Sequence, residues 1–292
     1  MSPRVLGVAL AVTSATAFGV MPVLTKVVYD DGADVVGVLS VRFTLAALVL
    51  LAIARLRSEA LPRGRALVTL LLLGGVGYVT ESLCYFAALT RISAGLTALL
   101  LYLYPALVVV LAAVLARVRP TTRALTCVAV ATLGTVLTIG PVGGGRTVGV
   151  LLGLASALTY ALYIVISSRV VAAGAPFATS ACVMGGAAVV YDMGSVPFGA
   201  DLPSSAGAWT ALLTVALVCT VLAVSTFFAA LPRLGAADIA VLSTIEPVVS
   251  VGVGAVALGE SLGAVQLAGG ALVLGAVAVL ARTPPAVPLD AP

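Results

Sequence analysis

The chain has 292 residues, of which 62% are hydrophobic and 9% are charged, against about 25% charged in a typical soluble domain. So few charges cannot cover a water-soluble surface of this size, and the composition predicts that lipid covers it instead. The net charge of +4 comes from basic residues scattered along the chain. That distribution argues against a nucleic-acid partner, which requires a basic stripe.

The residue types present exclude several kinds of chemistry. The sequence contains no histidine, which rules out His-based zinc sites and Ser-His-Asp or Cys-His catalytic systems. Its cysteines lie far apart within apolar segments, without Cys-x-x-Cys spacing, at positions Cys84, Cys127, Cys182 and Cys219; we expect them to fill space between helices. No GxxxxGK[ST] loop for ATP is found. We therefore predict no metal site and no cofactor.

Ten apolar stretches of about 20 residues follow one another, each long enough to cross ~30 Å of hydrocarbon at 1.5 Å per residue. None alternates like a strand, and lipid cannot satisfy an open backbone, so each is predicted to be a helix. The predicted helices cover residues 5–28, 34–55, 66–89, 94–116, 122–141, 147–168, 177–199, 207–230, 236–258 and 262–281. The Pro-rich tail at 283–292 is expected to lie outside any helix.

The two halves of the chain align without a gap when one is shifted by 142 residues. A single shift that serves both ends of the half indicates duplication rather than chance similarity between apolar segments. The matches include Gly7-Val8 with Gly149-Val150, Ser14-Ala15 with Ser156-Ala157, Phe86-Ala87-Ala88-Leu89 with Phe228-Ala229-Ala230-Leu231, and Pro105 with Pro247. We therefore predict two five-helix units, at 1–141 and 146–282.

Five helices per unit place the second unit upside down relative to the first in the membrane. With a cytoplasmic N-terminus, the basic residues on the inside are Arg4, Arg55, Arg57, Arg63, Arg65, Arg117, Arg119, Arg123, Arg169, Arg233 and Arg282. Those on the outside are Lys26, Arg91 and Arg146, while Arg42 lies within a segment. Cytoplasmic loops carry the excess of Lys and Arg, so this distribution supports the assumed orientation. The expected fold is an all-α membrane protein. It has ten transmembrane helices as inverted repeats, both termini are cytoplasmic, and the location is the inner membrane.

Inverted repeats have a functional consequence. Two similar units packed antiparallel can exchange conformations, so that a site at their interface is exposed alternately to each side. The sequence therefore predicts a secondary carrier with a small-molecule substrate.

Short motifs add a family resemblance that covers essentially the whole chain. They are Arg42-Phe43, Ala87-Ala88-Leu89, Tyr104-Pro105, Glu246-Pro247-Val248 and Leu258-Gly259-Glu260. With the five-plus-five plan, the chain resembles the EamA-type members of the drug/metabolite transporter superfamily. The resemblance implies export of amino acids, drugs or other metabolites. Where that family often repeats a Gly-Glu after the fourth helix, this chain has Arg117-Val118-Arg119.

Charged residues inside apolar helices are expensive, so each requires a partner or a function. Arg42 and Glu81 lie about eight residues from the outer ends of the second and third helices, roughly 12 Å deep at 1.5 Å per residue. We expect them to pair or to face one cavity. Two interpretations remain open: a structural ion pair, or a coupling site at which Glu81 titrates as protons or substrate pass.

The repeat-related prolines mark a second candidate site. Pro247 cannot donate a hydrogen bond to the carbonyl of Ser243, nor Pro105 to that of Leu101, so both helices are expected to kink. Glu246 and Tyr104 precede these prolines and would reach the middle of the membrane. Substrate contact and purely structural kinking are both compatible with the pattern.

Weaker candidates complete the prediction. Asp192 could bind a cation. Tyrosines within helices could line a cavity, although tyrosine at such positions is more often a packing residue with one hydrogen bond; they are Tyr78, Tyr85, Tyr160 and Tyr163. Lys26 can extend toward the interface and is assigned no site.

Two other classes of function compete with the carrier. A membrane-embedded enzyme acting on lipid would require clustered acids or a nucleophile–base pair, whereas the acids here are dispersed. An accessory protein without flux would have the same composition as a carrier. The preferred prediction is therefore a carrier and not an enzyme.

Overall fold

The computed structural model describes residues 2–89, 91–92, 94–117, 120–139, 147–171, 174–198, 200–258 and 263–281. Within these ranges the chain is helical and contains no strand. Several predicted features lie outside the described residues, namely the junction between the two units, the Val118-Arg119 and Gly259-Glu260 pairs, Arg146, Arg282 and the tail at 283–292.

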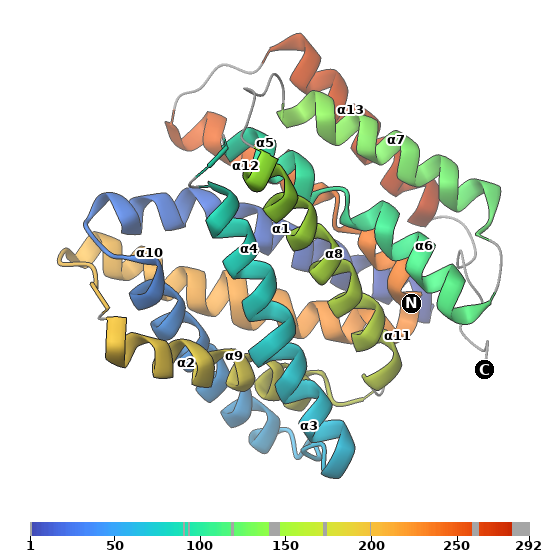
Figure 1. Ribbon diagram of the computed structural model, residues 1–292. Coiled ribbons are helices and arrows are strands. Elements are labelled where there is room, and N and C mark those ends of the chain that lie inside the picture. Colours follow the sequence, from blue (N-terminus) through green and yellow to red (C-terminus); the bar gives the residue numbers. More distant parts are fainter. Residues whose placement is uncertain are drawn as a thin grey trace.

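Helices occupy the segments that hydropathy predicted (Figure 1). In the first half they are α1 (Pro3–Asp30), α2 (Val35–Leu56), α3 (Gly64–Leu72), η1 (Leu73–Tyr78), α4 (Val79–Leu89), α5 (Ala94–Leu101), α6 (Tyr104–Ala116) and α7 (Thr122–Ile139). In the second half they are α8 (Thr147–Val170), α9 (Pro176–Phe198), α10 (Ala206–Ala216), η2 (Leu217–Leu222), α11 (Ala223–Leu242), α12 (Ile245–Leu258) and α13 (Ala264–Ala281).

Local sequence explains several helix starts. Ser2 caps α1 by accepting a hydrogen bond from the Val5 amide at 3.3 Å, and Asp34 caps α2 through the Gly37 amide at 2.6 Å. Such oxygens satisfy amides that have no partner within the helix. These two caps fix the starts of α1 and α2.

The third and eighth predicted helices each contain a π-helical turn, η1 and η2, in their middle. The eighth continues into the ninth, because α11 runs on to Leu242 with non-helical backbone at Gly235 alone (φ 78°, ψ 166°). Glycine tolerates this positive φ without a Cβ clash.

The fourth and ninth predicted helices are broken rather than kinked. Tyr102–Leu103 separates α5 from α6, and Ser243–Thr244 separates α11 from α12. Pro105 and Pro247 each lie in the first turn of the helix that follows. A proline fits there because first-turn amides need no partner within the helix.

Contacts between helices follow the internal repeat. The helix α2 packs along its counterpart α9, and α7 packs along its counterpart α13, as Figure 1 shows for the green and red pair. The helix α1 contacts α10, η2, α11 and α12, while its counterpart α8 contacts α3, η1, α4, α5 and α6. Exchanging the halves therefore preserves the pattern, so the two units are related by an approximate two-fold operation.

Glycines allow these helices to approach closely at equivalent places. A Cβ at Gly7 would lie 3.0 Å from Arg233, and one at the repeat-related Gly149 would lie 2.6 Å from Ile92. Gly153, four residues after Gly149, also lies at a close contact of α8, since a Cβ there would be 2.7 Å from Leu100. Small residues permit this packing between membrane helices.

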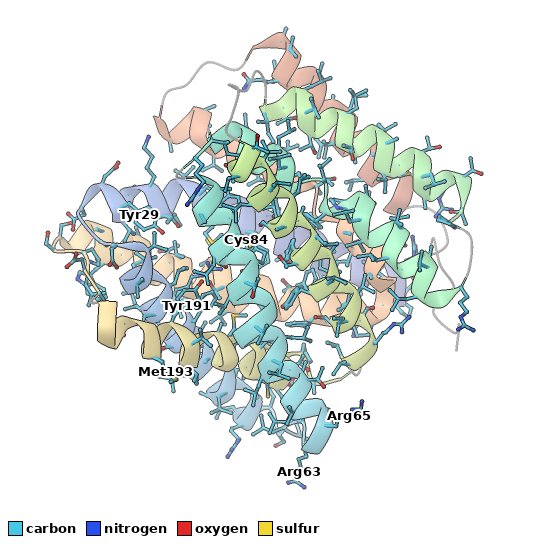
Figure 2. All side chains as sticks on the ribbon, viewed as in Figure 1. Tyr29, Arg63, Arg65, Cys84, Tyr191 and Met193 are labelled. Atoms are coloured by element: carbon cyan, nitrogen blue, oxygen red, sulfur yellow. The ribbon has the colours of Figure 1, made fainter. Side chains whose placement is uncertain are left out.

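The exterior of the bundle is apolar. Leu56 is 86% exposed and Val256 is 89% exposed, with many further leucines and valines on the outside. In the described part of the chain, seven helices are long and apolar enough to cross a membrane, and two shorter apolar helices cover Ile245–Ala257 and Ala264–Val279. Arg63 and Arg65 project from the start of α3 at one edge of the bundle (Figure 2). The chain is therefore a multi-pass membrane protein.

Candidate functional site

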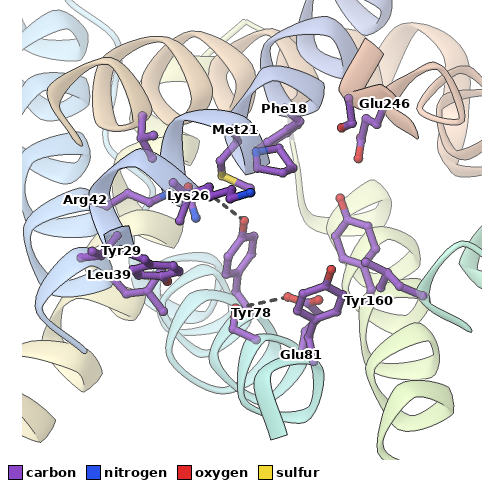
Figure 3. Close-up of a pocket in the computed structure, with 18 of the residues that line it drawn as sticks. Phe18, Met21, Lys26, Tyr29, Leu39, Arg42, Tyr78, Glu81, Tyr160 and Glu246 are labelled. Carbon is purple, nitrogen blue, oxygen red and sulfur yellow. Dashed lines mark hydrogen bonds between the residues drawn. The ribbon is translucent and has the colours of Figure 1, made fainter. Parts of the chain in front are cut away.

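A cavity of about 460 Å³ lies between the two halves. Its volume is within the range of small-molecule sites, about 300–1,000 Å³. Figure 3 shows most of the lining side chains, which come from α1, α2, η1, α4 and α5 of the first half and from α8, α10 and α12 of the second. They are Phe18, Met21, Pro22, Thr25, Lys26, Tyr29, Asp30, Val38, Leu39, Arg42, Tyr78, Glu81, Ser82, Tyr85, Leu101, Tyr102, Tyr160, Val215, Glu246 and Ser250.

The two halves of α1 have different surroundings. Its C-terminal half lines the cavity, with Lys26 and Asp30 exposed at the margin. Its N-terminal half is packed against the second repeat, where Ser14 donates a hydrogen bond to the carbonyl of Ala223 at 2.8 Å. Near the start of α1, Arg4 forms an ion pair of 3.0 Å with Asp238, which is 1% exposed.

Arg42 lines the cavity with its guanidinium held by neighbours. Its Nε donates to Thr220 Oγ1 at 2.7 Å and a terminal nitrogen donates to the Tyr78 hydroxyl at 3.4 Å. Its charged carbon also lies 4.9 Å from the centre of the Phe43 ring, a cation–π distance. Contacts from α2, η1 and η2 therefore fix the position of this charge.

Glu81 lines the same cavity but is not bonded to Arg42. Its carboxylate accepts hydrogen bonds from Ser82 and from Ser156 of the second half, both at 3.2 Å. No ion pair joins Glu81 to Arg42 within the described ranges. Of the two sequence-based alternatives, direct pairing is absent here and facing one cavity describes the arrangement.

Glu246 reaches the cavity from the first turn of α12. The Tyr102 hydroxyl lies near its carboxyl group. One turn further along α12, Ser250 donates to the carbonyl of Gly19 at 2.7 Å. The break before α12 thus places Glu246 between α5 and α1.

The predicted tyrosines form a wall two rings deep. Tyr78, Tyr85 and Tyr160 line the cavity, whereas Tyr104 and Tyr163 lie behind Tyr78 and Tyr160 and are buried. The ring of Tyr104 meets that of Tyr160 at 4.6 Å, and Tyr163 lies 5.7 Å from Tyr78. Tyr104 therefore supports the wall instead of reaching the cavity beside Glu246.

Asp192 lies elsewhere, between α9 and α2. Its carboxylate accepts hydrogen bonds from Ser40 and, at 2.7 Å, from Thr44. Neither Asp192 nor the two prolines Pro105 and Pro247 belong to the cavity lining. The hydroxyl partners give Asp192 a structural explanation.

Sequence reasoning missed several lining residues. The sequence suggests no site at Lys26, because a long side chain can extend outward, yet Lys26 lies at the cavity margin. Tyr29 and Tyr102 carried no motif. Pro22 was a usable signal, since a proline inside a membrane helix frees a carbonyl. Among the described residues, no group of three or more Cys, Asp or Glu is placed to hold a metal ion.

Comparison with protein families decides the classification. The sequence matches the EamA-like transporter family twice, over residues 5–140 and over 147–282. The chain belongs to the EamA-like transporter family. The family match confirms the resemblance and the presence of two repeats, and with the apolar helices it supports membrane transport of a small molecule.

Comparison with solved structures supports the fold. One crystal structure superposes with a TM-score of 0.82 at 21% identity, covering 94% of this chain and 98% of the other. At that identity the likeness concerns the fold alone. Among proteins of curated function, none matches the chain significantly.

Proposed function

We propose that this EamA-like protein is a secondary carrier that exports small organic metabolites or drug-like solutes by alternating access. In this proposal it has ten membrane spans in two inverted units, at 1–141 and 146–282, and both termini are in the cytoplasm of a cell whose inner membrane it occupies. The observation that supports this proposal most directly is the cavity lined by side chains from both repeats. A site shared by two exchangeable units is what alternating access requires.

The contacts along α1 support the direction of opening. The cavity margin carries Lys26 and Asp30 at the end that faces outward in this topology. At the cytoplasmic end, the Arg4–Asp238 ion pair and the Ser14–Ala223 hydrogen bond join the two repeats. The conformation is therefore assigned as open to the outside and closed to the cytoplasm.

Roles follow from the cavity lining. Glu81, held by neutral hydroxyls rather than by Arg42, is proposed to exchange protons during the cycle. Glu246 is proposed to contact the solute, and the tyrosine wall to pack against its apolar part. The lining has three carboxyl groups, of Asp30, Glu81 and Glu246, against two cationic side chains, of Lys26 and Arg42. This excess of carboxyl groups favours neutral, zwitterionic or cationic solutes over multiply anionic ones; saturable transport of a phosphorylated sugar would contradict this.

Flux through purified protein tests the proposal. Proteoliposomes containing only this chain are loaded with amino acids, amines, nucleosides or drug-like solutes, and efflux is followed with and without an inward proton gradient. We expect saturable efflux of at least one solute that empty liposomes lack and that the gradient accelerates. Turnover of a lipid without solute flux would instead indicate an enzyme, and absence of both would indicate an accessory protein.

A further inference from the structure

A backbone carbonyl of α1 is left without its helical partner beside the cavity. Pro22 lies inside α1 and has no amide hydrogen, so it cannot donate to the carbonyl of Phe18 four residues earlier. Residues four apart share one face of a helix, and both Phe18 and Pro22 line the cavity. The freed oxygen is therefore on the cavity side of α1.

A second carbonyl beside the cavity lies at the end of α5. Pro105 likewise cannot donate to the carbonyl of Leu101, which is the last residue of α5 and lines the cavity. The C-terminal end of a helix carries partial negative charge that favours a cation. Broken helices use such ends to bind cations in other transporter folds.

Glu246 contacts the segments that carry both carbonyls. Tyr102, the residue directly after Leu101, lies near the Glu246 carboxyl group, and both line the cavity. On the other side, α12 touches α1 so closely that a Cβ at Gly19, the residue after Phe18, would lie 2.8 Å from the Glu246 carbonyl. Figure 3 shows Phe18 and Glu246 on the same side of the cavity.

We infer that this corner of the cavity binds the primary ammonium group of an organic amine, through the Glu246 carboxylate and the carbonyls of Phe18 and Leu101. The inference rests on the proposed function and names its substrate class. A primary ammonium has three N–H donors, which matches three acceptors. The tyrosine wall packs against the apolar part of the same molecule. Arg42 is held by hydrogen bonds to Thr220 and Tyr78.

The same argument predicts discrimination between amines. A quaternary ammonium keeps its charge but has no N–H, so it would leave the two carbonyls without a partner. Removing hydrogen bonds that involve a charged group weakens binding substantially. A cavity that used only charge and aromatic contacts would bind both kinds of cation similarly.

Calorimetric titration of the purified chain tests this with three matched probes, 2-phenylethylamine, its N,N,N-trimethyl derivative and phenylacetate. We expect 2-phenylethylamine to bind about 10-fold or more tightly than the trimethyl compound, and phenylacetate not to compete. Glu246→Gln should weaken amine binding by about 10-fold or more. Glu59→Gln is the control, because Glu59 accepts a hydrogen bond from Ala178 outside the cavity.

Pro22→Ala provides a variant that should fold at least as well. The substituted alanine would supply the amide that Phe18 lacks, so the helix gains a hydrogen bond while the cavity loses an acceptor. We expect weaker binding of 2-phenylethylamine, unchanged binding of the trimethyl compound and an unchanged or higher melting temperature.

Three results would overturn the inference: equal affinity for the two cations, an amine affinity unaffected by Glu246→Gln, or no amine binding by folded protein. If liposomes still transported another solute in that case, the proposed carrier function would stand and only the substrate class would fall. Amine binding without flux of any solute would overturn the carrier function and leave the ammonium site.

Discussion

Individual acidic residues in this membrane protein lie in different surroundings, and only some of them face the cavity. Asp192 is bonded to two hydroxyls on α2, whereas Glu81 and Glu246 face a cavity. All three look alike in the sequence, as single acids within apolar segments. Their spatial partners come from helices far away in the chain, so sequence position alone could not distinguish them.

A first prediction concerns Asp192. Asp192→Ala leaves Ser40 and Thr44 without their shared acceptor at the α2–α9 contact. We expect a loss of about 1–2 kcal/mol in unfolding free energy, measured by thermal melting, with the half-saturation constant for transport unchanged. A variant of normal stability that has lost substrate binding would show that Asp192 belongs to the site.

A second prediction concerns Glu81. Glu81→Gln keeps the hydrogen-bonding shape but removes the proton exchange proposed for the cycle. We expect proteoliposome transport by this variant to be less dependent on pH than that of the wild type, while Glu59→Gln retains the wild-type profile. A folded Glu81→Gln protein with an unchanged pH profile would eliminate the coupling role.

A third prediction concerns Asp31, in the loop between α1 and α2. Its carboxylate accepts the amides of Ser205 at 2.9 Å and Ser204 at 2.6 Å, and these bonds lower the pKa of Asp31 below its ordinary value of 3.8. The stabilisation is therefore complete above pH 3.8 and is lost as the pH falls through the lower folded value. Asp31→Ala should melt earlier at about pH 7, and the difference should shrink below pH 3.8; a constant difference would argue against this linkage.

At the scale of helices, close approach depends on particular glycines. A Cβ at Gly186 of α9 would lie 2.2 Å from the carbonyl of Leu71, whereas one at Gly185 meets nothing within 4 Å. Gly186→Ala should therefore cost about 1–3 kcal/mol through overpacking. Gly185→Ala should be neutral or stabilising by up to about 1 kcal/mol, because alanine favours helix. Equal melting temperatures for these adjacent substitutions would contradict the packing described.

Hydropathy and the internal repeat predicted the helical segments well, because each stretch must satisfy its backbone within lipid. They did not predict the complete breaks at Tyr102–Leu103 and Ser243–Thr244, because a proline is compatible with both a kink and a new helix start. The candidate site was predicted in part. Arg42 and Glu81 face one cavity, as predicted. Each also has a hydroxyl partner from the other repeat, Thr220 for Arg42 and Ser156 for Glu81, and the spacing of residues along the sequence does not reveal such partners.

For the whole molecule, the Arg4–Asp238 ion pair joins the repeats at the end opposite the cavity margin. Opening that end would separate the pair, so Asp238→Asn should favour the opposite conformation. The test is a cysteine at Ala11, which is 1% exposed, in a cysteine-free background. We expect Asp238→Asn to raise the rate of labelling from the cytoplasmic face about 10-fold, with Glu59→Gln as control. An unchanged labelling rate would show that the Arg4–Asp238 ion pair does not hold this end closed.

That ion pair also makes the two halves unequal. Under the repeat shift Arg4 corresponds to Arg146, but Asp238 corresponds to Leu96, whose side chain has no carboxylate. The same ion pair therefore cannot form between the corresponding positions. In the proposed carrier, the conformation closed to the cytoplasm then has an ion pair that the opposite conformation lacks. A ligand's apparent affinity scales with the fraction of molecules competent to bind it. If the chain alternates as proposed, we therefore expect a solute to reach half-saturation at different concentrations from the two faces of the membrane.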